Sequence, residues 1–104
     1  MSADNTRRRL QFLRAELKQV SLELARLKRD QRACKRNLEV VISSAYCPVC
    51  LQPLSLEYKY EYTDKMGAIF REIEKKIAGI IERQESLEQE IRGLEEALGD
   101  TNGG

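Results

Sequence analysis

Histidine and tryptophan are absent from the 104 residues, proline occurs twice, and aromatic side chains make up only 6%. The sequence has no paired acid and base next to a nucleophile and no G-x-x-x-x-G-K-[ST] phosphate loop, so we expect no enzymatic activity and no ATPase of its own. No run of eighteen apolar residues occurs, and the opening MSADNTRRRL has no apolar segment behind it. We therefore expect neither a membrane-spanning helix nor a secretory signal.

Cysteine is also scarce, with three residues in the chain. An odd number argues against a secreted disulfide scaffold and favours a reducing, intracellular compartment such as cytoplasm, nucleoid or nucleus. At 104 residues the chain forms one domain at most. Because 34% of the residues are charged, few remain for a globular core.

What the sequence does contain is two long heptad patterns, uninterrupted by proline. The first comprises Leu10, Leu13, Leu17, Val20, Leu24, Leu27, Gln31, Cys34, Leu38 and Val41. The second comprises Met66, Phe70, Ile73, Ile77, Ile80, Gln84, Leu87, Ile91, Leu94 and Leu98. Steps of three and four residues predict two helices that pack through a coiled-coil seam, and the single glutamine in each seam is expected to set register.

Charge is distributed unevenly between the halves, because residues 1–50 hold eleven Lys and Arg against five Asp and Glu, and residues 51–104 hold seven against twelve. In an antiparallel hairpin the e positions of the two arms face each other, and so do the g positions, with mostly opposite charge. The e positions include Arg14, Lys28 and Lys35 on the first arm and Glu74, Glu88 and Glu95 on the second, and the g positions include Glu16, Glu23 and Asp30 on the first arm and Lys76 and Arg83 on the second. A parallel homodimer of the first helix would also pair opposite charges, so charge alone leaves both arrangements open. The short connection decides for an all-α antiparallel coiled-coil hairpin. Two registers one heptad apart remain open.

The predicted boundaries are a first arm over 5–43, a tip over 44–63, a second arm over 64–98 and a frayed tail over 99–104. Ser2, Asp4 or Thr6 could cap the first helix, Thr63 or Asp64 the second, and Gly99 could end it. In the tip, Leu56, Tyr58, Tyr60 and Tyr62 alternate with charged residues, which predicts a short β element.

Cys47 and Cys50 have the Cys-x-x-Cys spacing of half a zinc site, which usually needs four ligands. Cys34 lies thirteen residues earlier in the seam, roughly 20 Å along a helix, so we interpret it as a core residue. Glu57 or Glu61 could complete a mixed site, but a second Cys-x-x-Cys from another copy fits better. The alternatives are a structural turn with two free thiols and, less favoured without a βαβ setting, a redox pair.

The CPVC sequence at the apex of an antiparallel coiled coil resembles the zinc hook of the SbcC-type DNA-repair ATPases, whose relatives are the Rad-fifty proteins. The resemblance implies that Cys47 and Cys50 are metal ligands, that Pro48 and Val49 shape the turn, and that two hairpins share one zinc per dimer. It also implies a role in tethering DNA-repair ATPase complexes. Leu51 stands where that family often has glycine.

Two other functions remain open. Ile69 and Ile81 widen the apolar face of the second arm, as expected for a protein–protein scaffold that dimerises through its helical flanks. The basic first arm could bind nucleic acid, although the near-zero total charge and the lack of interleaved aromatic residues argue against direct binding.

Overall fold

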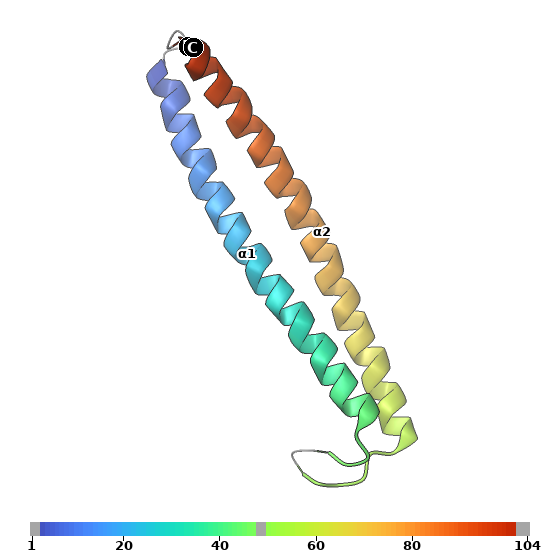
Figure 1. Ribbon diagram of the computed structural model, residues 1–104. Helices are drawn as coiled ribbons and strands as arrows, with labels where there is room; N and C mark the ends of the chain where they lie inside the picture. The colour runs from blue at the N-terminus through green and yellow to red at the C-terminus, as the bar shows by residue number, and fades with distance from the viewer. Residues whose placement is uncertain (1–2, 48–49, 102–104) are drawn as a thin grey trace. The chain divides into compact units, whose positions relative to one another are not determined.

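The computed structural model describes residues 3–47 and 50–101. Helix α1 spans Ala3–Ser43 and helix α2 spans Leu56–Thr101 (Figure 1). The chain divides into two compact units. The terminal unit, described over residues 3–25 and 78–101, contains the start of α1 and the end of α2, and the tip unit, Arg26–Ile77, contains the remainder of both helices and their connection. The predicted all-α helical hairpin is confirmed.

The core of the terminal unit consists of heptad residues from both helices. Leu10 and Leu13 of α1 are buried together with Leu87 and Ile91 of α2. The half-buried side chains that pack against this cluster are Leu17, Val20, Leu94 and Leu98. Each of these positions belongs to a predicted heptad seam, so apolar burial along one stripe of each helix holds the unit together.

Ion pairs flank this core and fix its register. They join Arg9 to Glu90 at 3.0 Å, Arg14 to Glu95 at 2.9 Å, and Arg83 to Glu16. Glu16 lies seven residues after Arg9 in α1, and its partner Arg83 lies seven residues before Glu90, the partner of Arg9, in α2. The helices of this unit are therefore antiparallel, as the short connection predicted, and one register is selected from the alternatives.

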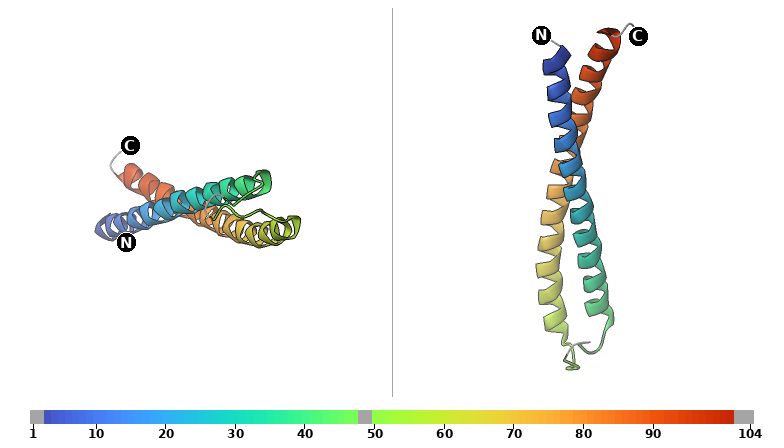
Figure 2. Two further views of the ribbon diagram at one scale, coloured as in Figure 1. Left: turned by 90° about the horizontal axis from the view of Figure 1, so that it is seen from below. Right: turned by 90° about the vertical axis from the view of Figure 1, so that its left-hand side faces the viewer.

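In the tip unit, Leu27 and Cys34 are buried. The Cys34 thiol lies 3.7 Å from the carbonyl oxygen of Met66, and Lys59 Nζ donates a hydrogen bond of 3.1 Å to the carbonyl oxygen of Ile42. From Cys34 to Ile42 the residue number increases along α1, while that of the contacting residue in α2 decreases from Met66 to Lys59. The two helices therefore lie side by side and antiparallel in this unit (Figure 2).

The predicted start of the second helix is wrong, because α2 begins at Leu56. Ser55 caps it: its Oγ accepts a hydrogen bond of 3.1 Å from the N–H of Tyr58, and its carbonyl oxygen accepts the N–H of Lys59 at 3.1 Å. The alternating tyrosines thus form the first helical turns, where Tyr58 and Tyr62 stack at 6.2 Å between ring centroids. The β element predicted there is wrong because this cap and the i, i+4 ring contact favour a helix.

The predicted ends of the helices need smaller corrections. Asp4 and Thr6 lie inside α1, which begins at Ala3, whereas Ser2 is outside the described residues. Thr63 lies inside α2, where its hydroxyl donates to the carbonyl oxygen of Lys59 at 2.7 Å. Gly99 does not end α2, which continues to Thr101, and residues 102–104 of the predicted tail are outside the described part of the chain.

Candidate metal centre at the tip

The segment over residues 44–55 turns the chain from α1 to α2 through paired backbone groups. The N–H of Leu54 donates to the carbonyl oxygen of Ala45 at 2.9 Å, and Tyr46 and Pro53 form an isolated antiparallel β-bridge. At the adjacent residues toward the end of the loop, the N–H of Cys47 donates to the carbonyl oxygen of Gln52 at 2.8 Å. The tip therefore contains β-type pairing, but at residues other than the predicted alternating stretch.

Leu51 closes this loop in an unusual backbone conformation. Its N–H donates to the carbonyl oxygen of Cys47 at 2.8 Å, and its φ of 60° lies in the left-handed region. That region favours glycine, and a branched side chain there costs on the order of 1–2 kcal/mol. Leu51 therefore adopts a backbone conformation that glycine would adopt more easily.

Of the two cysteines of the motif, Cys47 begins the loop that these hydrogen bonds close, and Cys50 lies within it. Cys47 is half-buried, Cys50 is exposed, and neither is in a disulfide. Both line a hollow of about 230 Å³ whose other walls include Pro53 and Tyr58. Pro48 and Val49, predicted to shape the turn, lie outside the described residues. Thiolates are the donor type that structural zinc sites use, so two reduced cysteines that line one hollow fit a zinc ligand pair.

The described residues of one chain do not form a completed metal site. Among residues 3–47 and 50–101, no group of three or more His, Cys, Asp or Glu side chains is placed to hold a metal ion. Cys34 is 7% exposed and packs beside Met66, which agrees with its interpretation as a core residue. The glutamates considered for a mixed site, Glu57 and Glu61, are exposed on the first turns of α2. Among these candidate ligands, Cys47 and Cys50 are the two that line one hollow of the described tip.

The residues predicted to widen an apolar flank do not lie in the same unit. Ile69 belongs to the tip unit and is 46% exposed, whereas Ile81 belongs to the terminal unit and is half-buried. Each is a single apolar side chain beside its own seam, and isolated surface residues of this kind are common.

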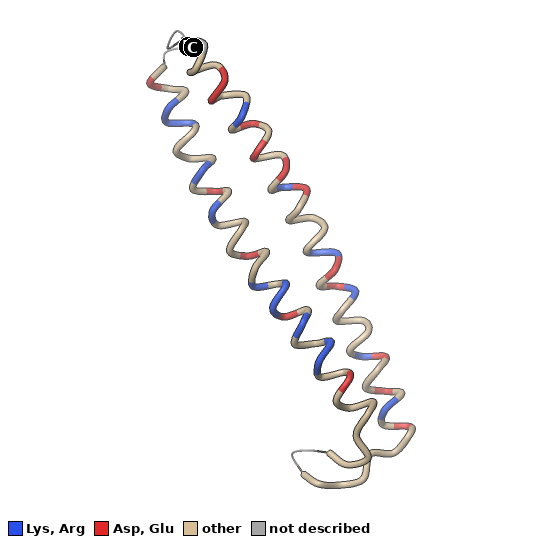
Figure 3. The backbone as a smooth tube through the Cα atoms, viewed as in Figure 1, with Lys and Arg blue, Asp and Glu red and all other residues tan. Residues whose placement is uncertain are grey.

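The basic residues of α1 fall into two groups with different surroundings. In the terminal unit, Arg9 and Arg14 are paired with glutamates of α2. In the tip unit, a run of exposed cations on α1 has no ion pair among the described residues (Figure 3). This run consists of Arg26, Lys28, Arg29, Arg32, Lys35 and Arg36. Among the described residues, glutamates of α2 therefore pair with basic residues of α1 in the terminal unit, as expected, but not with the basic residues of this run.

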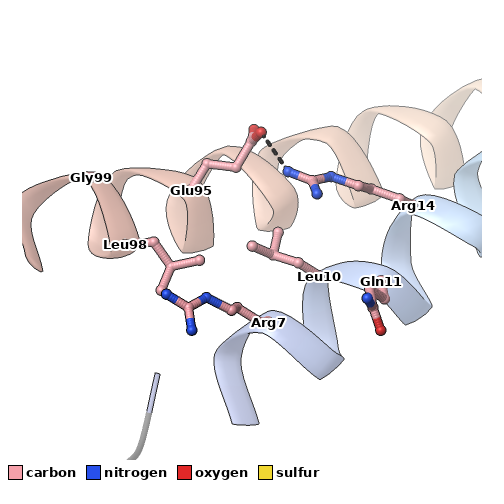
Figure 4. Close-up of a pocket in the computed structure, with 7 residues that line it drawn as sticks. All are labelled: Arg7, Leu10, Gln11, Arg14, Glu95, Leu98 and Gly99. Atoms are coloured by element: carbon pink, nitrogen blue, oxygen red, sulfur yellow. Dashed lines mark hydrogen bonds and ion pairs between the residues drawn. The ribbon is translucent and has the colours of Figure 1, made fainter. Parts of the chain in front are cut away.

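A larger hollow, of about 490 Å³, opens beside the core of the terminal unit (Figure 4). Leu10 and Leu98 of the seam form its floor, and Arg14 reaches across it to Glu95. Because these two charged groups satisfy each other, the hollow is the exposed edge of the helical seam and supplies no candidate catalytic pair.

Comparison with known proteins finds no matching family model, no matching curated protein and no matching solved structure. Over the described residues, neither α1 nor α2 combines the length and the apolarity that crossing a membrane requires.

Proposed function

We propose that this chain is a zinc-dependent homodimerisation module. Two helical hairpins meet tip to tip, and Cys47 and Cys50 of each copy supply the four thiolates that hold one zinc ion. Bound zinc would supply a tetrahedral link between the copies, and the thiolates would be its ligands. Through the resemblance of the CPVC motif to the zinc hook, the proposal extends to tethering of DNA-repair ATPase complexes.

The observation that carries the proposal is the position of the cysteine pair. Cys47 and Cys50 line one hollow on a closed turn at the end of a hairpin, and the described chain offers no cluster that would complete their site. A turn at an apex is open to an identical apex, and a two-fold axis through the shared metal would double the two thiolates to four.

The experiment that tests this function compares the Cys47→Ser, Cys50→Ser double variant with the parent chain. We expect the parent to bind one zinc per two chains and to sediment as a dimer, and the double variant to bind no zinc and to sediment as a monomer. Cys34→Ala is the matched control, because its buried thiol lies in the seam and its loss should leave the zinc content unchanged. A double variant that dimerises as well as the parent would contradict the proposal.

A second candidate function is electrostatic binding of nucleic acid by the unpaired basic run of α1. Its six cations lie between positions 26 and 36, about 15 Å of helix, with Asp30 as the single acidic residue among them. The tip unit as a whole holds eleven Lys and Arg against seven Asp and Glu. Cations that no carboxylate neutralises remain available to phosphates.

This second function is tested by titrating the chain into labelled duplex DNA at 50 and 200 mM salt. Binding through the basic run predicts an affinity that falls steeply with salt and that weakens in the Arg29→Gln, Arg32→Gln, Arg36→Gln variant. The Arg8→Gln, Lys18→Gln, Arg92→Gln variant removes the same charge from the terminal unit and should bind like the parent. Equal losses in both variants would show that only net charge matters and would reject the basic run as a site.

A further inference from the structure

Exposed apolar side chains are frequent in the segment that contains the cysteine pair and the start of α2. Five large ones lie between positions 46 and 60, and their exposed fractions run from 47% to 75%. They are Tyr46, Leu51, Leu56, Tyr58 and Tyr60, here called the tip collar. Tyr58 also lines the hollow that Cys47 and Cys50 line, and Leu51 directly follows Cys50 in the chain. The collar and the candidate metal centre thus belong to the same turn and the helix start that follows it.

The part of the chain that carries the cysteine pair and the first three collar residues is free of charge, whereas Tyr58 and Tyr60 lie among Glu57, Lys59 and Glu61. Residues 40–56 contain no Lys, Arg, Asp or Glu, although such residues make up 34% of the sequence. Depletion of charge together with enrichment of tyrosine and leucine is the composition of the buried centre of a protein–protein interface, and not of a solvated surface. A neutral surface also meets its own copy without repulsion, which a charged one does not.

Leu51 is the most exposed of these side chains, at 75%, and it is also the described non-glycine residue with positive φ. The left-handed backbone would accommodate glycine more easily, and an exposed leucine adds nothing to the packing of its own chain. Burial of the Leu51 side chain in a partner would explain why a residue with a strained backbone presents an apolar side chain to solvent.

We propose that the tip collar is the second half of the dimer interface, and that its occupant is the collar of a second copy of this chain. The inference rests on the proposed function, because the incomplete metal centre is what identifies the partner as another copy. Leu51 and its neighbours then exclude water around the shared thiolates, and the dimer is held by apolar contact as well as by the metal. In a two-fold arrangement each residue is used twice, so a single substitution acts on both sides of the interface.

The test measures dimer dissociation constants by analytical ultracentrifugation for two variants of Leu51, with saturating zinc and with a chelator. Leu51→Gln removes the apolar side chain and retains the backbone cost, whereas Leu51→Gly removes both. We expect each variant to keep one zinc per two chains and to raise the dissociation constant with zinc by about tenfold or more. Leu22→Gln is the matched control, because Leu22 is 57% exposed in the terminal unit, and it should dimerise like the parent.

The outcomes separate the collar from the zinc hypothesis. If both Leu51 variants dimerise as tightly as the parent, the collar is rejected, while the chelator still decides the role of zinc. If the parent dimerises equally with and without the chelator, and the Leu51 variants weaken that dimer, the collar holds and the zinc function is rejected. Weakening by Leu22→Gln to the same degree would show a general effect of surface polarity and would reject the collar.

Discussion

Cys47 and Gln52 are joined through their backbones, with the N–H of Cys47 donating to the carbonyl oxygen of Gln52 at 2.8 Å. The carbonyl oxygen of Cys47 in turn accepts the N–H of Leu51 at the same distance. Both backbone polar groups of the first cysteine are therefore engaged in closing a six-residue loop, and the second cysteine lies within that loop. A closed loop restricts the backbone of both cysteines, and under the proposed function this would lower the entropy that metal binding must overcome.

The cap at Ser55 gives the first prediction. Ser55→Ala removes the Oγ that accepts the N–H of Tyr58, and we expect it to lower the free energy of unfolding by about 1 kcal/mol. Ser55→Thr keeps an acceptor hydroxyl and should lose less. Urea denaturation followed by circular dichroism, in the presence of a chelator, measures both. An alanine variant as stable as the parent would show that the hydroxyl does not cap α2.

The core of the terminal unit gives the second prediction. Leu13 is 1% exposed, so Leu13→Ala should cost about 2–5 kcal/mol through lost apolar burial and the cavity left behind. Leu22→Ala is the comparison, since Leu22 lies outside the seam of the same helix and its truncation should change stability by less than about 0.5 kcal/mol. Thermal denaturation separates the two, and equal losses would contradict the assigned seam.

The third prediction concerns the ion pair between Arg14 and Glu95. Both side chains are about half exposed, so the pair contributes only about 0.2–1 kcal/mol. Arg14→Glu and Glu95→Arg should each destabilise the hairpin by placing like charges together, and the double exchange should recover most of the loss. A double-mutant cycle at low salt measures this coupling, which should shrink in 1 M NaCl. A cycle without coupling would show that the pair does not hold the register.

The helical hairpin could be predicted from the sequence because the same heptad spacing of apolar residues recurs along both arms. Ten seam positions in each arm show the same period, and the opposite charges expected at facing flank positions are found in pairs such as Arg14 with Glu95. The register could not be predicted, because a slip of one heptad also places apolar residues opposite each other. The contact of Gln84 Nε2 with Ser21 Oγ, at 3.0 Å, is one of the polar interactions that selects among such registers.

The tip was predicted less well, because its signals are short. Four alternating residues from Leu56 to Tyr62 indicated a strand, yet one serine at position 55 supplies a helix cap that outweighs them. That cap could have been recognised, since Ser55 is followed by residues that continue the helix to the seam. The left-handed conformation of Leu51 could not, because leucine is a poor marker of positive φ.

The measurement that tests the central claim most directly is native mass spectrometry of the intact chain, purified with zinc and then treated with a chelator. The account predicts two chains with one zinc ion, converting to single chains when the metal is removed. A chain that stays monomeric and metal-free at saturating zinc would contradict the claim that Cys47 and Cys50 form half of a shared metal centre.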